Sequence, residues 1–312
     1  MINGLILGRL GNQMFQYATL RAMQEKYYNN EMINMNFKIV RKLGLKEDGF
    51  DNQLEMFKLK KDKICFDQEV KMSIRQRMFY YAYLFFLKLI RVFSENKKNE
   101  INRNKFERKI QEKYNNLGLF LYSYGFYDFK KSKEKEKIFK GYFESAKFFN
   151  DIRNELLEEF EPINDKLPKN KELYDSIENN NSVCISIRRG DFLIKKHKDD
   201  CFVCDNTYFE NAMKEIKARV KNPQFIVFSD DIEWCKKNMF FDKGTLFEDG
   251  DDPVWEKLRL MYSCKHFIIS NSTFSWWSQY LSRNENKIVV APSRWRNKSY
   301  IIDIYEKDWI LI

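Results

Sequence analysis

Two adjacent arginines, Arg188 and Arg189, follow a short apolar segment at residues 183–187 that reads as a strand. Burying guanidinium groups at a strand end is costly unless an anion or a carboxylate pairs with them. A guanidinium group can donate two hydrogen bonds at once, which suits a diphosphate. An ion pair with Asp191 is the alternative. The pattern therefore predicts either an anion site or an internal ion pair directly after this strand.

The N-terminal segment offers a second candidate ligand contact. Gly11 and Asn12 follow an apolar stretch, residues 3–8, and begin a helix predicted to run to about residue 28. Glycine lets the backbone approach a ligand closely, and a helix N-terminus presents free N–H groups to an anion. The dinucleotide fingerprint GxGxxG is absent. A simple role at the helix start is the alternative for Asn12.

Two further strand ends carry polar residues. Asp230 comes after the apolar residues 225–228, where its carboxylate can accept hydrogen bonds from a guanine edge or a ribose, or cap the next helix. A polar run that includes Ser272 and Thr273 comes after residues 266–269 and opens a helix, which predicts a phosphate cradle.

These segments belong to a regular alternation in the second half of the chain. Strands are predicted at 183–187, 225–228, 266–269 and 288–291, and helices at 207–220, 231–238, 253–264 and 273–281. Asp205 or Asn206 is expected to cap the helix that starts at residue 207. Continuous apolar strands between helices indicate a parallel sheet covered on both faces. Ligands of such sheets bind beyond the carboxyl ends of the strands, where these polar residues lie.

Length and composition limit the number of domains and the classes of partner. The chain has 312 residues, of which 44% are hydrophobic, so it is predicted to fold into about two domains, and a wholly disordered chain is excluded. A net charge of +10 points to nucleic acid, an anionic membrane or a phosphorylated small molecule. Residues 161–170 read as a linker or as the entry to a helix. Six scattered cysteines and no signal-peptide pattern favour a cytoplasmic protein with reduced thiols.

The longest apolar run, residues 78–87, is too short to span a bilayer, which needs about 20 residues. Arg75, Arg77, Lys88 and Arg91 flank it. The run predicts either a buried aromatic helix or a helix that lies in the membrane interface, with its cations near anionic headgroups.

Two patterns imitate metal sites but are incomplete. His197, Cys201 and Cys204 supply three ligands, whereas a structural zinc needs four. Asp249 and Asp251 have the DxD spacing that binds Mn²⁺ in some nucleotide-sugar enzymes, but a bare DxD is common. Neither pattern is predicted to hold a metal.

Six motifs in order resemble the bacterial α-1,2-fucosyltransferases of glycosyltransferase family 11. They are LGRLGNQMFQYA at 7–18, GYFESAKFF at 141–149, ISIRRGDF at 185–192, VFSDDIEWCKKN at 227–238, LMYSCKHFIISNSTFSWWSQYL at 260–281 and APSRW at 291–295. Their order and combination are highly specific, although single motifs are not. Residues 30–140 carry no matching motif.

The resemblance implies an α/β, GT-B-type fold with two Rossmann-like domains and the active site in the cleft between them. We expect an N-terminal, acceptor-side domain at 1–165, a GDP-sugar-binding domain at 166–295 and a tail at 296–312 that packs back on the N-terminal domain. The implied enzyme moves L-fucose, with inversion, from GDP-β-L-fucose to the 2-hydroxyl of a galactose-type acceptor, and needs no metal or other cofactor. The expected acceptor is an O-antigen or capsule repeat. In one alternative this acceptor is lipid-linked, and the enzyme reaches it through peripheral contact with the cytoplasmic face of the inner membrane.

The resemblance also implies which residues contact the donor: Gly11, Asn12, Arg188, Asp230, Ser272, Thr273 and Phe274. Arg188 would grip the diphosphate and neutralise the charge that grows on the leaving group. Asp230 would read guanine. Arg189 is a weaker candidate, expected to pair with Asp191 as a scaffold residue.

The general base for the acceptor hydroxyl is not identified by the motifs. Asp191 and His197 are the nearest candidates, and Asp191 is preferred. Ser186 stands where the family usually has a histidine of the nucleotide site, which leaves the donor contacts open. A different donor or linkage on the same fold, or a non-catalytic glycan- or nucleotide-binding protein, is the alternative. Nucleic acid is not expected as a partner, because no RNA-binding motif occurs.

Overall fold

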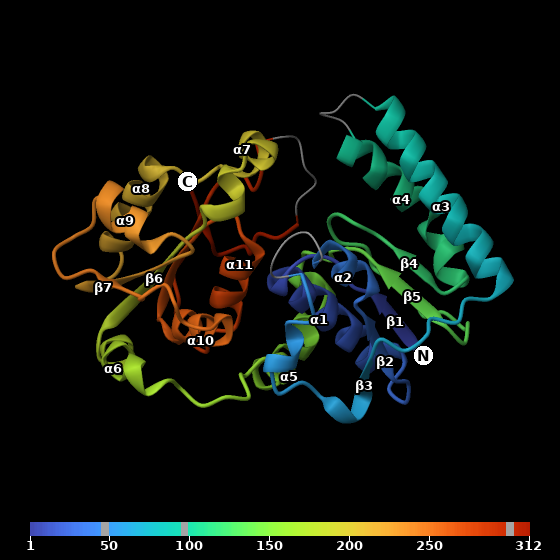
Figure 1. Cartoon of the computed structure of the whole chain (residues 1–312), viewed down its shortest axis with the longest axis horizontal. Helices are drawn as coiled ribbons and strands as arrows, with labels where there is room; N and C mark the ends of the chain where they lie inside the picture. The colour runs from blue at the N-terminus through green and yellow to red at the C-terminus, as the bar shows by residue number, and fades with distance from the viewer. Residues whose placement is uncertain (45–49, 95–98, 298–302) are drawn as a thin grey trace. The chain divides into compact units, whose positions relative to one another are not determined.

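The computed structural model describes residues 1–44, 50–94, 99–297 and 303–312, and the chain divides into two compact units (Figure 1). The N-terminal unit comprises Met1–Phe160 and Ser299–Tyr305, and the C-terminal unit comprises Glu161–Lys298 and Glu306–Ile312. Each unit contains its own parallel sheet, so the α/β class with two parallel-sheet units is confirmed.

The N-terminal unit is built on a five-stranded parallel sheet with the order β3-β2-β1-β5-β4. Its strands are β1 (Ile2–Leu5), β2 (Ile33–Asn36), β3 (Ile64–Phe66), β4 (Leu119–Leu121) and β5 (Lys137–Lys140). Its helices are α1 (Leu10–Tyr27), α2 (Lys38–Gly44), α3 (Ile74–Phe93), α4 (Asn99–Asn116) and α5 (Arg153–Glu159). Short 3-10 turns occur at Leu54–Met56, Lys61–Lys63, Ala146–Phe148 and Asn150–Ile152.

Helix α1 is held by a buried ionic contact with α5. The Tyr17 hydroxyl donates to Glu159 at 2.6 Å, and the Arg21 guanidinium donates to the same carboxylate at 2.8 Å. The Arg21 side chain is fully buried. Because a buried guanidinium needs a paired carboxylate, this contact fixes α1 and the polar loop before it.

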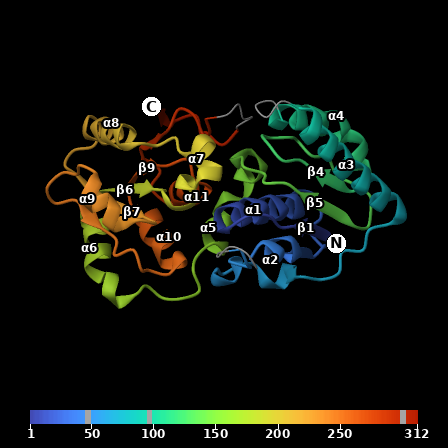
Figure 2. The ribbon, with the colours of Figure 1, turned by 45° about the horizontal axis from the view of Figure 1, so that its top comes forward.

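Helices α3 and α4 run side by side at one end of the N-terminal sheet, as both views show (Figures 1 and 2). Ser73 and Gln76 form a reciprocal capping box at the start of α3. The apolar run expected at 78–87 is therefore the middle of a longer, capped helix. None of the helices in the described residues has the length and apolar character needed to cross a bilayer.

The C-terminal unit is built on a six-stranded parallel sheet with the order β11-β10-β9-β6-β7-β8. Its strands are β6 (Asn181–Ile187), β7 (Pro223–Ser229), β8 (Leu246–Phe247), β9 (His266–Ile269), β10 (Val289–Ala291) and β11 (Ile310–Leu311). Its helices are α6 (Lys171–Asn179), α7 (Lys195–Cys201), α8 (Asn206–Lys217), α9 (Ile232–Asn238), α10 (Val254–Ser263) and α11 (Thr273–Tyr280). Short 3-10 turns occur at Pro168–Asn170 and Gly190–Leu193.

The strands and helices predicted in this unit are found within a few residues of their expected bounds. Asp205 caps α8 by accepting a hydrogen bond from the Tyr208 N–H at 2.9 Å, as one of the two expected caps. The fully buried Trp276 and Trp277 of α11 pack in the core. The short edge strands β8 and β11 were not predicted.

The C-terminal segment treated above as a tail contributes to both units. Lys147 pairs with Asp303 at 2.6 Å, inside the N-terminal unit. Strand β11 instead pairs in parallel with β10, in the sheet of the C-terminal unit. The segment is thus part of the folded structure of each unit.

Candidate active site

The sheet order of the C-terminal unit brings the carboxyl ends of β9, β6 and β7 next to one another. Ile187 of β6 is in register with Ser229 of β7. Arg188 and Asp230 each follow one residue later, so these two side chains leave the sheet as neighbours. The sequence predicted this edge as the site from the apolar runs alone.

Arg188 lies between two carboxylates. Its Nη2 and Nε donate to Oδ1 of Asp191 at 2.7 and 3.1 Å, and its Nη1 lies 2.9 Å from Oδ2 of Asp230. These contacts use three of the five N–H donors of the guanidinium group. The Arg188 side chain remains 31% exposed, so a ligand can reach it. The structure therefore contains the Arg188–Asp191 ion pair that the sequence left open as an alternative to an anion site.

Arg189 has different partners from those expected. Its Nε donates to Asp231 at 3.3 Å, and its guanidinium lies over the Trp234 ring at 3.1 Å from the centroid. Its backbone N–H donates to Oδ1 of Asp230 at 2.9 Å. The expected pairing of Arg189 with Asp191 is wrong, because Arg188 occupies that carboxylate and Arg189 turns toward α9.

Three serine hydroxyls form a buried chain beneath this edge. Ser275 Oγ lies 2.6 Å from Ser186 Oγ and 3.0 Å from Ser270 Oγ. Ser186, at the position where a histidine was expected, thus bonds to the first turn of α11. Through the Ser275 hydroxyl, this chain links β6, the residue after β9 and the start of α11.

Helix α11 begins at the same edge. Ser272 is its N-cap, and the Ser272 side chain makes no capping hydrogen bond. The backbone N–H groups of Thr273, Phe274 and Ser275 lie in the first turn, where an α-helix offers no internal acceptor. These groups can donate to an anion, and this is the segment where the sequence predicts a phosphate cradle.

His197 lies on α7 and takes no part in the arginine and carboxylate contacts described above. Its backbone N–H bonds to the Ile194 carbonyl at 2.7 Å. Within the described part of the chain, its imidazole makes no hydrogen bond or ion pair. The contacts therefore connect Asp191, but not His197, to Arg188.

Asn271 holds the segment that follows β9 and was not identified from the sequence. Its Nδ2 donates to the carbonyls of Cys201 at 2.8 Å and Trp295 at 2.9 Å. Its Oδ1 accepts from the Cys204 thiol at 3.6 Å. Burial raises the pKa of Cys204 to about 12, so this thiol is protonated at neutral pH. Only the position of Asn271 in a polar run after a strand could have indicated this role.

Gly11 and Asn12 lie in the first turn of α1, in the N-terminal unit, whereas the other candidate residues lie in the C-terminal unit. Gly8 has φ +74°, and a Cβ there would come within 2.4 Å of the Asn12 amide nitrogen. The Asn12 Oδ1 is buried and has no hydrogen-bond partner among the described residues. A buried amide oxygen without a partner at a helix start can accept a hydrogen bond from a ligand.

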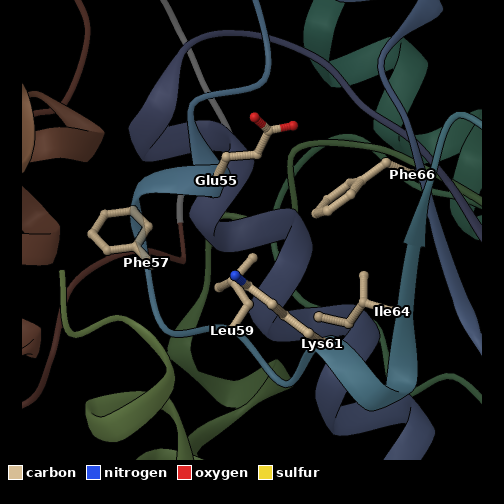
Figure 3. A pocket seen from close by; sticks show the side chains of 6 residues that line it. All are labelled: Glu55, Phe57, Leu59, Lys61, Ile64 and Phe66. Carbon is tan, nitrogen blue, oxygen red and sulfur yellow. The ribbon is translucent and has the colours of Figure 1, made fainter. Parts of the chain in front are cut away.

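Two other features involve none of the predicted site residues. Asp251 of the DxD pattern pairs with Lys169 at 2.8 Å, which holds the pKa of the aspartate below its usual range. A cavity of about 420 Å³ lies near β3 of the N-terminal unit (Figure 3). Its lining is Glu55, Phe57, Leu59, Lys61, Ile64 and Phe66, none of which is a predicted site residue.

Two bacterial proteins resemble the chain along most of its length, and a human protein resembles a third of it. "Alpha-1,2-colitosyltransferase" of Escherichia coli is 29% identical over a match covering 98% of this chain and 97% of that protein. "O-antigen biosynthesis glycosyltransferase WbnK" of Escherichia coli is 28% identical, covering 94% of this chain and 95% of that protein. Human "Galactoside alpha-(1,2)-fucosyltransferase 1" is 35% identical over 104 residues, which are 32% of this chain and 28% of that protein.

A family model gives the decisive match. The model described as glycosyl transferase family 11 matches residues 82–312, well over half of the chain. The match includes the strand ends that carry Arg188, Asp230 and Ser272. The chain belongs to glycosyltransferase family 11.

Proposed function

We propose that the chain is an inverting α-1,2-fucosyltransferase that moves L-fucose from GDP-β-L-fucose to the 2-hydroxyl of a galactose-type acceptor in a surface glycan. Membership of glycosyltransferase family 11 supports the reaction class. The observation that carries the proposal is Arg188, partly exposed beyond β6 and oriented by two carboxylates. The O-antigen relative supports an oligosaccharide acceptor of the O-antigen or capsule type.

Arg188 is the proposed electrostatic catalyst. As the bond between C1 of fucose and the diphosphate oxygen breaks, negative charge grows on the leaving GDP, and a guanidinium nearby stabilises that charge. Asp191 and Asp230 hold the guanidinium plane in place but also compete with the diphosphate for its N–H groups. Bound donor must therefore share Arg188 with these carboxylates.

Other groups supply the remaining donor contacts in this proposal. The first turn of α11, with Ser272, Thr273 and Phe274, donates backbone N–H groups to phosphate. Asp230 reads guanine, and Asn12 with Gly11 is a further proposed donor contact. In this proposal the arginine and the backbone N–H groups neutralise the charge on the leaving GDP, and no metal ion is assigned that role.

The acceptor step is a single displacement. The acceptor O2 attacks C1 of fucose from the face opposite GDP, the C1–O bond to the diphosphate breaks, and the O2 proton passes to a base. Asp191 is the proposed base, since its carboxylate lies at the reacting edge beside Arg188. His197 is the other candidate.

The role of Arg188 is tested by measuring fucose transfer and GDP-fucose hydrolysis in Arg188→Ala and Arg188→Lys, with chelator present. We expect Arg188→Ala to lose at least about 100-fold in turnover and Arg188→Lys to recover part of it. Arg219→Ala, an exposed arginine of the same unit, is the charge-matched control. Full activity in Arg188→Ala would remove the proposed role, and activity that depends on an added metal would refute metal independence.

A second donor is favoured by one observation. The colitosyltransferase relative matches nearly the whole chain, whereas the human fucosyltransferase matches about a third of it. Colitose is L-fucose without its 3-hydroxyl, so one site could bind either sugar through the shared GDP. Turnover measured with GDP-fucose and with GDP-colitose decides between them, because a site that hydrogen-bonds the 3-hydroxyl rejects the sugar that lacks it.

The nucleotide is tested separately by thermal shift. GDP should raise the melting temperature, while UDP and CDP at the same concentration should not. Asp230→Ala should reduce the GDP shift if this carboxylate reads guanine. A shift with UDP in place of GDP would overturn the donor class.

A further inference from the structure

Helix α3 exposes an apolar stripe that the proposed transfer reaction does not use. Its members are spaced three, four or seven residues apart and are between 59% and 80% exposed: Ile74, Met78, Tyr81, Phe85 and Val92. At 3.6 residues per turn, these positions form one line along the whole helix. A contiguous apolar surface of this kind usually marks an interaction site.

The opposite face of α3 fixes the helix to the N-terminal unit. The buried Tyr83 hydroxyl donates to Glu107 of α4 at 2.7 Å. The buried Gln76 amide donates to the carbonyls of Leu117 and Glu136 at 2.9 and 2.8 Å. The contacts of Gln76 and Tyr83 therefore hold one face of α3 on its own unit and leave the apolar stripe turned outward.

Positive charge accompanies the stripe. Arg75, Arg77, Lys88 and Arg91 are all exposed, and α3 contains no aspartate or glutamate. Long basic side chains can lay their stems along apolar surface while their charged ends contact lipid phosphates. An isologous contact through α3 would instead set these cations against cations of the second copy, since α3 has no acidic residue, and this opposes association.

We propose that α3 is an interfacial docking helix, which lies in the plane of an anionic membrane surface with its apolar stripe among the lipid chains. The occupant is a bilayer containing anionic phospholipid, selected by the cations on both sides of the stripe. The helix does not span the bilayer, because its inner face remains packed on the unit. This inference goes beyond the transfer reaction and concerns where the enzyme acts.

Vesicle sedimentation tests the proposal on the full chain without donor or acceptor, so its outcome does not depend on the transfer reaction. We expect binding to vesicles of phosphatidylcholine mixed with phosphatidylglycerol, and at least about tenfold weaker binding to phosphatidylcholine alone. The triple variant Arg77→Gln, Lys88→Gln, Arg91→Gln should lose about tenfold in binding to the anionic vesicles. The variant Tyr81→Ser, Phe85→Ser should lose a similar amount.

A matched control separates docking from overall charge. The variant Lys221→Gln, Lys237→Gln, Lys243→Gln removes the same charge from exposed positions of the C-terminal unit and should bind like the wild type. Circular dichroism checks that each variant is folded. If a multiple variant of α3 does not fold, the single variant Phe85→Ser is measured in its place. Four results would overturn the proposal: no vesicle binding, equal binding to both lipids, unchanged binding in the α3 variants, or equal loss in the control. A dimer in solution abolished by the α3 changes would also overturn it.

Discussion

At the scale of single residues, Arg188 and Arg189 show how a short motif places two neighbouring arginines in different surroundings. In the segment Arg188-Arg189-Gly190-Asp191, alternate side chains leave the strand end in different directions. One arginine is oriented by Asp191 and Asp230, and the next stacks on Trp234. Two residues of the same type thus acquire different roles, with Arg188 available to a ligand and Arg189 packed against α9.

Gly190 is required by the closeness of Asp230. A Cβ at Gly190 would lie 2.6 Å from Oδ2 of Asp230, so Gly190→Ala must push this carboxylate away from Arg188. We expect transfer from the donor to fall about tenfold or more, because small misplacements of a catalytic group are costly.

A double-mutant cycle provides the control for Gly190→Ala. In an Asp230→Ala background the clashing carboxylate is gone, so adding Gly190→Ala should change turnover little. Turnover and melting temperature are measured for all four proteins. Equal effects of Gly190→Ala in both backgrounds would show that the contact with Asp230 is not the cause.

At the scale of elements, the α1–α5 contact makes a prediction about stability. Glu159→Ala leaves Arg21 buried without its main carboxylate and removes the acceptor of the Tyr17 hydroxyl. The free energy of unfolding should fall by about 3 kcal/mol, measured by urea denaturation. Glu155→Ala, an exposed glutamate of the same helix, should change it by less than about 0.5 kcal/mol. Similar losses in both variants would contradict the special role of the buried pair.

The elements of the C-terminal unit could be predicted because their signals are local. The strands near residues 185, 226 and 268 are continuous apolar runs, and capping residues separate them from helices. In the N-terminal unit the signals conflict. Strand β2 carries buried Asn34, which donates to Asn3 of β1 at 2.9 Å. Asn34 also exchanges hydrogen bonds with the backbone of Gln68, so all these partners lie outside its own segment and cannot be recognised from that segment.

The candidate site was predictable in residue type but not in pairing. The sequence indicates that arginines and carboxylates gather at one sheet edge, since parallel strands end there. It does not indicate which carboxylate reaches which arginine, because Asp191, Asp230 and Asp231 all lie close enough in the fold. Backbone direction after β6 decides that Arg188, and not Arg189, contacts Asp191.

At the scale of the whole molecule, one histidine links stability to pH. The His266 Nδ1 accepts the Ile288 N–H at 3.1 Å, which requires an unprotonated nitrogen. Burial, with Lys265 nearby, lowers the pKa of His266 below 6.5. The unfolded chain therefore binds a proton more readily than the folded chain, and stability should fall as pH drops below 6.5 toward the folded-state pKa.

His266→Asn isolates this effect. Urea unfolding at about pH 7.5 and about pH 5.5 should show a smaller loss of stability in His266→Asn than in the wild type. His197→Asn, which changes the other histidine, should show the wild-type loss. A wild-type loss equal to that of His266→Asn would mean that His266 does not contribute.

The shared C-terminal segment has a consequence for dissecting this enzyme. Each unit is discontinuous in sequence, because residues 299–305 complete the first and residues 306–312 complete the second. No single contiguous fragment can therefore encode either unit in full. A fragment of residues 161–298 would leave β10 as an uncovered edge, open to strand pairing between copies. Simple truncation would therefore yield incomplete domains. A continuous gene for the second unit would need residue 298 joined to residue 306 by a linker, and one for the first unit would need residues 299–305 fused to residues 1–160.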